Sequence, residues 1–178
     1  MESRLALGAD DAGFGLKRII AEYLDGLGVS YDDVGVPDPS SGSGPDPVEY
    51  PDVASTVAFG IRDGRYDRGI LICGTGIGMA ITANKVPGVR AAQAHDVYSA
   101  ERARKSNDAH VLTMGARVIG PELAKTIVKA WLDSDFAGGA SARKVAKIGE
   151  IEARAYTRAE DEALVETVIG ADVHPEAE

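Results

Sequence analysis

The sequence predicts an α/β protein in which five parallel strands form one sheet between two layers of helices. Three observations lead to this prediction. Short apolar runs alternate with segments of helical periodicity along the whole chain. The run from Gly69 to Cys73 is apolar throughout, which is typical of a strand buried on both faces of a sheet. The chain has 178 residues and shows no internal repeat, so we expect one domain.

Each element follows from its local pattern. The predicted strands are Arg4 to Gly8, Val29 to Val34, Gly69 to Cys73, Val89 to Ala94 and His110 to Met114. The predicted helices are Gly13 to Gly28, Tyr50 to Arg62, Met79 to Lys85, Tyr98 to Lys105, Pro121 to Leu132 and Ser141 to Tyr156. Residues 37–47 contain only Pro, Ser, Gly and Asp, which indicates a flexible loop. We expect a domain over residues 1–158 and a C-terminal extension with an acidic tail over 159–178.

The composition excludes several classes of function. The formal net charge is −9, so the surface repels nucleic acid and anionic membranes, and we expect neither as a partner. No apolar run is long enough for a transmembrane helix, and Met1 to Ala9 lacks the features of a signal peptide. We therefore expect a cytoplasmic protein. One Cys excludes an internal disulfide, and with three His residues no Cys/His metal site is expected.

The segment from Cys73 to Gly78 gives the strongest chemical signal. Gly74, Gly76 and Gly78 alternate directly after the buried strand and before a helix. Glycine lets the backbone turn sharply and present N–H groups to an anion, and the start of a helix adds positive partial charge. A Cys beside such donors can react as a thiolate. Two other interpretations stay open at this point: a tight turn with an inert buried Cys, and a dinucleotide-binding loop, although the spacing is G-x-G-x-G.

Polar residues also follow the other predicted strands, and each has a structural alternative. Asp10 and Asp11 close the first strand, where they suit contacts to sugar hydroxyls or the capping of a helix. His95 follows the fourth strand and is a candidate for substrate binding. Arg117 follows the fifth strand as a phosphate clamp or as half of a surface ion pair. Because sites in parallel sheets lie beyond the carboxyl ends of the strands, we expect Asp10, Cys73 and His95 to converge.

Six segments occur in an order that is specific as a set. They are Gly8 to Lys17, Ile70 to Met79, Ala83 to Arg90, Tyr98 to Ala100, Ser106 to Asp108 and Met114 to Gly120. Together they resemble one family, the type B ribose-5-phosphate isomerases with the galactose-6-phosphate isomerase subunits. The resemblance spans residues 3–156, which is nearly the whole predicted domain.

This resemblance implies a three-layer Rossmann-like fold with a five-stranded parallel sheet, no metal and no nucleotide or other cofactor. It implies a homodimer or homotetramer with active sites shared between subunits. The implied activity is aldose–ketose isomerisation of a small sugar phosphate through a cis-enediolate. Cys73 would be the base that moves a proton between C1 and C2 of the sugar. Thr75 and the N–H groups of Gly74, Gly76 and Gly78 would stabilise the developing oxyanion.

The resemblance also implies the substrate contacts. Asp10 and Asn107 would bind sugar oxygens, and Arg117 would bind the phosphate. In the structural alternative, Asn107 simply ends a helix.

Four positions depart from the family pattern. The family usually has His where this chain has Asp11 and Ser106, and Arg where it has Ala140 and Lys144. The first His helps to bind phosphate and the second helps to open the sugar ring. We expect Lys144 to contribute to substrate binding, and Arg143 lies one residue away.

The residue at position 106 bears on the size of the substrate. Pentose and hexose phosphates exist mainly as rings, and the hydroxyl of Ser106 does not titrate near neutral pH as a ring-opening group should. A tetrose 4-phosphate cannot close a furanose ring, so it needs no such group. We therefore predict better turnover of erythrulose 4-phosphate than of ribose 5-phosphate. Two other hypotheses are a catalytically silent sugar-phosphate-binding protein and a nucleotide-dependent oxidoreductase, and the second lacks a glycine fingerprint after its first strand.

Overall fold

The computed structural model describes residues 4–35 and 48–158. The predicted loop 37–47 and the predicted extension 159–178 lie outside the described residues. The strands are β1 (Leu5–Ala9), β2 (Tyr31–Asp33), β3 (Arg68–Cys73), β4 (Ala91–Gln93) and β5 (Val111–Gly115). They form one sheet in the order β2-β1-β3-β5-β4, and every pair of neighbours is parallel. The predicted five-stranded parallel sheet is therefore confirmed.

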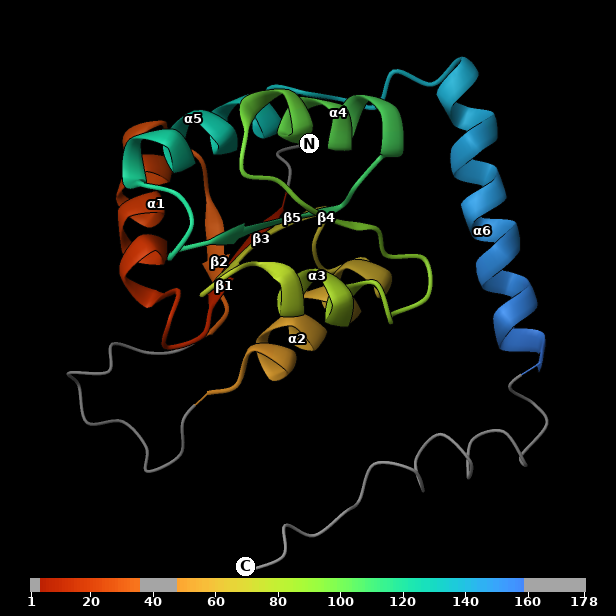
Figure 1. Cartoon of the computed structure of the whole chain (residues 1–178), viewed down its shortest axis with the longest axis horizontal. Helices are drawn as coiled ribbons and strands as arrows, with labels where there is room; N and C mark the ends of the chain where they lie inside the picture. The colour runs from red at the N-terminus through yellow and green to blue at the C-terminus, as the bar shows by residue number, and fades with distance from the viewer. Residues whose placement is uncertain (1–3, 36–47, 159–178) are drawn as a thin grey trace, which may run out of the picture.

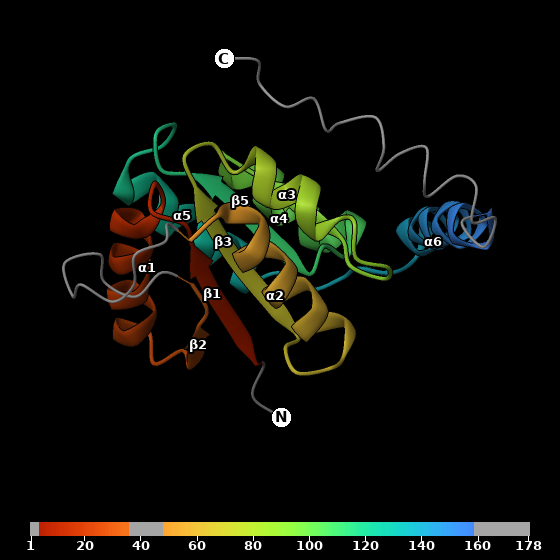
Figure 2. The ribbon, with the colours of Figure 1, turned by 90° about the horizontal axis from the view of Figure 1, so that it is seen from below.

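Helices cover both faces of this sheet (Figures 1 and 2). One face packs against α1 (Phe14–Gly26), α4 (Val97–Asn107) and α5 (Pro121–Leu132), and the other against α2 (Tyr50–Arg62) and α3 (Ile77–Ala83). The three-layer Rossmann-like arrangement expected from the sequence is present. The last described helix, α6 (Ala140–Arg158), stands beside these layers on the side of α4. Among the described helices, none combines the length and the apolar character needed to span a membrane.

The alternation of side chains along β3 divides the core in two. Ile70 and Ile72 belong to the apolar cluster under α1, α4 and α5. Leu71 and Cys73 belong to the cluster under α2 and α3. Successive residues of a strand point to opposite faces of the sheet, so this division follows from the strand geometry. The last residue of the central strand therefore presents its thiol to the face that α2 and α3 cover.

Several element boundaries differ from the predicted ones for physical reasons. The edge strands β2 and β4 have 3 residues each, shorter than predicted, because an edge strand has a partner on one side only. The Asn84 side chain covers part of the free edge of β4, since it donates to the Ala91 carbonyl and accepts from the Ala91 N–H. Helix α3 begins at Ile77, two residues before the predicted Met79, because Gly76 turns the chain with a φ of 80°.

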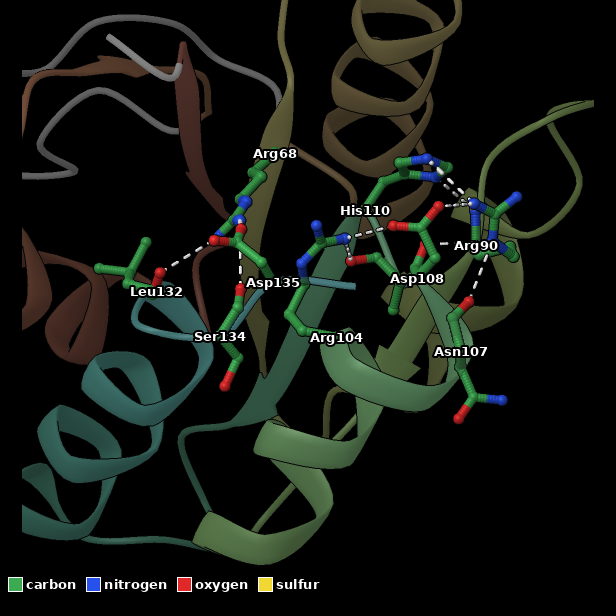
Figure 3. A network of polar contacts seen from close by, with 10 residues as sticks. Arg68, Arg90, Arg104, Asn107, Asp108, His110, Leu132, Ser134 and Asp135 are labelled. Atoms are coloured by element: carbon green, nitrogen blue, oxygen red, sulfur yellow. Dashed lines mark hydrogen bonds and ion pairs between the residues drawn. The ribbon is translucent and has the colours of Figure 1, made fainter. Parts of the chain in front are cut away.

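A network of polar contacts joins the amino-terminal ends of the strands to the end of α4 (Figure 3). Asp108 accepts hydrogen bonds from Arg90 at 2.7 Å and from Arg104 at 3.0 Å. The ring of His110 lies against Arg90, and its Nδ1 accepts the backbone N–H of that residue at 3.2 Å. Farther along the same edge, Arg68 donates to Asp135. The contacts of Asp108 with Arg90 and Arg104 help to fix the start of β5, because a largely buried ion pair is costly to separate.

We predict that His110 makes the fold sensitive to acid. Burial, with a smaller contribution from the nearby Arg90, lowers the pKa of His110 from 6.5 to about 4. The folded state thus holds the ring neutral, while the unfolded chain takes up a proton below pH 6.5. Stability from this group is complete above that pH and is lost as the pH falls toward 4. Because the ring is partly exposed to solvent, we expect a loss of about 1–2 kcal/mol.

Urea unfolding of the wild type and of His110→Asn at pH 7 and pH 4.5 measures this effect. The Asn amide oxygen can accept the Arg90 N–H but does not titrate. The wild type should lose more free energy of unfolding between the two pH values than the variant does. Equal losses would show that His110 is not responsible.

Candidate active site

The candidate site lies where β1 and β3 end side by side. Strand order reverses at this point of the sheet, because β2 lies to one side of β1 and β3 to the other. Ligands of open parallel sheets bind outside the carboxyl ends of the strands at such a reversal. Ala9 pairs with Ile72, so Asp10 and Cys73 follow adjacent positions on neighbouring strands. The predicted convergence of these two residues is therefore present.

A close backbone approach at Gly13 holds this corner together. A Cβ atom on Gly13 would lie 2.1 Å from the carbonyl oxygen of Ile72, a distance that no real contact allows. The Gly13 N–H also donates to the carboxylate of Asp10 at 2.9 Å. Asp10 thus has the structural role considered as its alternative, since it stabilises the turn into α1. Its second oxygen is not engaged by this bond.

The Cys73 thiol is buried inside the glycine-rich turn. Its Sγ accepts the N–H of Gly76 at 3.0 Å. The φ of 80° at Gly76 lies in the left-handed region, where a side chain would be strained, so the glycine is what allows this N–H to point back at the sulfur. Thr75 is exposed at the tip of the turn, and its Oγ1 accepts the N–H of Ile77 at 3.3 Å.

Two side chains that the sequence analysis did not select hold the carbonyl groups of this turn. Gln93, at the end of β4, donates to the Thr75 carbonyl at 2.6 Å. Thr113, in β5, donates to the Gly76 carbonyl at 2.9 Å. Thr113 is a polar residue inside an apolar run that predicts a buried strand, and this was a usable signal. Gln93 gave no such signal, because polar residues are common on an edge strand.

Arg117 and His95 border the same turn. A Cβ on Gly74 would lie 3.5 Å from the Nε of Arg117, so the guanidinium lies against the first glycine of the turn. His95 accepts the N–H of Gly115 through Nε2 at 2.9 Å. Gly115 is the partner of Cys73 in the sheet, so His95 lies one strand away from the thiol. A neutral ring in this contact carries its proton on Nδ1.

The carboxylates add negative charge beside the basic group. Burial raises the pKa of Asp10, and the neighbouring charge of Asp11 acts in the same direction. The Gly13 N–H and Arg117 act against this rise. Asp11 itself is exposed. The corner therefore combines one cation, one partly buried carboxyl and a set of backbone donors around the thiol, which suits a polar anionic ligand rather than an apolar one.

Two predicted site residues do not lie near Cys73 in the same chain. Asn107 is the last residue of α4, a helix that starts beside His95 and runs 11 residues to the opposite edge of the sheet. At 1.5 Å per residue this separates the two ends by about 15 Å. Lys144 is exposed on α6, beyond that edge (Figure 1). His110 directly precedes β5 at the same far edge.

From the sequence, no Cys/His metal site is expected. Within residues 4–35 and 48–158, no three Cys, His or carboxylate side chains are arranged to hold a metal ion.

Comparison with known proteins assigns the chain to a family. A sequence profile of the family described as Ribose/Galactose Isomerase matches residues 5–148. The chain belongs to this family. A D-erythrulose-4-phosphate isomerase of Pectobacterium atrosepticum is 59% identical over 148 residues, which cover 83% of this chain and 94% of the relative. A ribose-5-P isomerase B of Listeria innocua is 52% identical over 149 residues, covering 84% and 97%.

A solved structure gives the same assignment. The ribose-5-phosphate isomerase B of Clostridium thermocellum superposes with a TM-score of 0.78 and 45% identity, covering 85% of this chain and 98% of the other. The sequence match and the structural match thus agree on the Ribose/Galactose Isomerase family.

We predict that Gly13 is required for stability and that its neighbour Gly15 is not. Gly13→Ala would force α1 away from β3, because the added carbon meets backbone atoms of Ile72. We expect the free energy of unfolding to fall by about 2–3 kcal/mol. Gly15→Ala is the matched control in the same helix, since nothing lies within 4 Å of its Cβ position. That change should stabilise the protein by about 0.5–1 kcal/mol. Urea titrations that gave equal effects would contradict the close approach.

Proposed function

We propose that this protein interconverts an aldose and a ketose phosphate, with a four-carbon sugar 4-phosphate as its preferred substrate and Cys73 as the base. One observation supports the catalytic part above all. The thiol of Cys73 accepts a backbone N–H at 3.0 Å inside a turn that faces the carboxyl edge of the sheet. The thiolate is the form of cysteine able to accept a proton, and this hydrogen bond fixes where the sulfur lies at that edge.

The reaction needs one group that moves a proton and several that bear negative charge. The Cys73 thiolate removes a proton from the hydroxyl-bearing carbon beside the carbonyl, which leaves a cis-enediolate and a neutral thiol. The thiol then returns the proton to the neighbouring carbon, while the hydroxyl proton passes from one oxygen of the cis-enediolate to the other, so no other reactant is consumed. We assign the developing oxyanion to the N–H groups of Gly74 and Gly78 and the hydroxyl of Thr75, which lie in the turn and in the first turn of α3.

Charged side chains around the turn suit the rest of the substrate. Arg117 offers a planar fork that matches phosphate oxygens, and it lies against Gly74. Asp10 and His95 can accept or donate hydrogen bonds to sugar hydroxyls. Asp11 is an exposed carboxylate, which would repel a phosphate placed beside it. This favours a phosphate position on the Arg117 side of the thiol.

Two observations favour a four-carbon substrate. Ser106 cannot serve as a titrating ring-opening group, and a tetrose 4-phosphate needs none. The relative from Pectobacterium atrosepticum, whose name refers to erythrulose 4-phosphate, is more similar to this chain than the relative from Listeria innocua named for ribose. A reducing compartment keeps the single cysteine as a free thiol, so we propose a cytoplasmic location as well.

A shared site explains why Asn107 and Lys144 lie far from Cys73. We propose that the protein forms a homodimer or homotetramer in which these residues complete the site of a neighbouring subunit. Helix α6 supports this, because Ile148 and Ile151 expose 44% and 59% of their surface to solvent. Apolar side chains on one helix face favour burial against another chain.

A silent binding protein on the same fold is the competing function. It would need the phosphate contacts but not a thiol held by a backbone donor. Replacing Cys73 and measuring turnover therefore distinguishes an isomerase from a binding protein.

We predict that Cys73→Ala keeps the fold and loses nearly all turnover. The change removes the proton acceptor and leaves the turn intact, since Gly76 and Thr75 are unchanged. Turnover of erythrulose 4-phosphate, followed by aldose formation, should fall by at least about a thousandfold, or about 4 kcal/mol in the barrier. Circular dichroism checks the fold. Residual activity within about tenfold of wild type would rule out Cys73 as the base.

We predict a preference for the shorter substrate. The value of kcat/KM for erythrulose 4-phosphate should exceed that for ribose 5-phosphate by at least about tenfold. A difference of this size is typical when two substrates differ in one group that contacts the enzyme. Ser106→His is the matched variant, because it restores a titrating group at the family position. It should raise kcat/KM for ribose 5-phosphate and leave the tetrose value little changed. A wild-type preference for ribose 5-phosphate would show that our substrate assignment is wrong.

We predict that two inactive variants complement each other. In a shared site, Cys73 and Asn107 come from different subunits, so Cys73→Ala and Asn107→Ala each remove a group that a different subunit contributes. Random mixing into dimers should restore about a quarter of wild-type activity, because half of the dimers are hybrids with one intact site of two. Mixing Cys73→Ala with Arg117→Ala is the control, since both residues come from one chain and no site recovers. Absence of recovery in the first mixture would place Asn107 outside the shared site.

A further inference from the structure

Two consecutive peptide groups in the glycine-rich turn are each held from both ends. The first joins Thr75 to Gly76. Its carbonyl accepts the Nε2 of Gln93 at 2.6 Å, and its N–H donates to the Sγ of Cys73 at 3.0 Å. In a trans peptide the C=O and N–H bonds point in opposite directions. Gln93 and the thiol therefore lie at opposite edges of one rigid peptide group.

The second peptide group joins Gly76 to Ile77 and repeats this arrangement. Its carbonyl accepts the Oγ1 of Thr113 at 2.9 Å. Its N–H donates to the Oγ1 of Thr75 at 3.3 Å. Thr113 and the hydroxyl of Thr75 thus lie at opposite edges of this second peptide group.

We infer that Gln93 and Thr113 are positioning residues of the isomerase site, with Gln93 acting on Cys73 and Thr113 acting on Thr75, each through one peptide group. The inference rests on the proposed role of Cys73 as the base. Each side chain fixes the rotation of a peptide plane, so that its N–H stays directed at a reacting group. A donor at the carbonyl also polarises the peptide and strengthens the hydrogen bond that its N–H donates.

Packing alone does not supply this control. A Cβ on Gly76 would lie 2.9 Å from the carbonyl carbon of Met114, so the backbone of β5 fixes how near the turn lies. Such contacts limit the distance between the two segments, whereas hydrogen bonds are directional and fix the orientation of the peptide groups. The two side chains come from β4 and β5, so the sheet itself sets the direction of the donors.

The burial of the two residues differs, and this sets the expected size of each effect. Thr113 is fully buried, so loss of its hydroxyl leaves the Gly76 carbonyl without water to replace it. Gln93 is exposed, so water can take over part of its hydrogen bond. Removal of the Thr113 hydroxyl should therefore have the larger effect on turnover.

The single cysteine makes the test direct. Because the chain has one Cys, the rate of alkylation by iodoacetamide as a function of pH reports on Cys73 alone. Gln93→Leu should raise the pH midpoint of alkylation, because the Gly76 N–H is then no longer held toward the sulfur. Thr113→Val should leave that midpoint unchanged, because it acts on the other peptide group.

Turnover provides the second readout. Both variants should lower kcat, by about tenfold for Thr113→Val and less for Gln93→Leu, with KM within about twofold of wild type. Thr113→Ser keeps the hydroxyl and should restore most of kcat. Thr126→Val is the matched control, since it removes a hydroxyl that binds a helix carbonyl in α5, away from the turn. It should behave as wild type in both assays.

Two outcomes would overturn the inference. One is a wild-type alkylation midpoint in Gln93→Leu. The other is an equal rise of the midpoint in Gln93→Leu and Thr113→Val, which would indicate general loosening of the turn. Gln93 is exposed, so its variant remains informative even where Thr113→Val folds poorly. The alkylation result does not depend on the substrate, so it stands apart from a failure of the proposed function.

Discussion

The parallel pairing of β3 with its two neighbours is the constraint on which the rest of the site depends. Ala9 pairs with Ile72 on one side, and Gly115 pairs with Cys73 on the other. These two registers bring the turns after β1, β3 and β5 together at one edge. A shift of one residue in either pair would turn the thiol toward the other face of the sheet, away from its donors. The chemistry therefore relies on backbone register before it relies on any side chain.

Much of this arrangement could be predicted from the sequence. The apolar run that ends at Cys73 and the three alternating glycines predicted a buried strand followed by a turn before a helix, and these are present. The helices over Tyr50–Arg62 and Pro121–Leu132 were predicted with their observed bounds. Local periodicity and a proline in the first turn were sufficient there, because no distant contact decides where those helices begin.

The remainder depends on contacts between segments far apart in the chain. No local pattern indicates that Gly13 meets the backbone of Ile72, since its φ of −90° suits any residue. The hydrogen bonds from Gln93 and Thr113 join residues 18 and 37 positions apart. The edge strands were predicted too long, because the sequence does not show which strands lack a second partner. Asn107 was linked to the site through the family resemblance, and its distance from Cys73 follows only from the direction of α4.

This geometry separates the chemistry from the choice of substrate. The proposed base, Cys73, and its backbone donor belong to the turn after the central strand, where packing on both faces leaves little room for change. Ser106 is half-buried and Asn107 is exposed at the end of α4, and Lys144 is exposed on α6. In the proposed shared site, substitutions at these outer positions would alter how a sugar is opened or where its phosphate binds without disturbing the thiol. That division gives a physical reason why relatives named for four-carbon and five-carbon sugars share one fold, and why position 106 is where this chain's substrate choice is best tested.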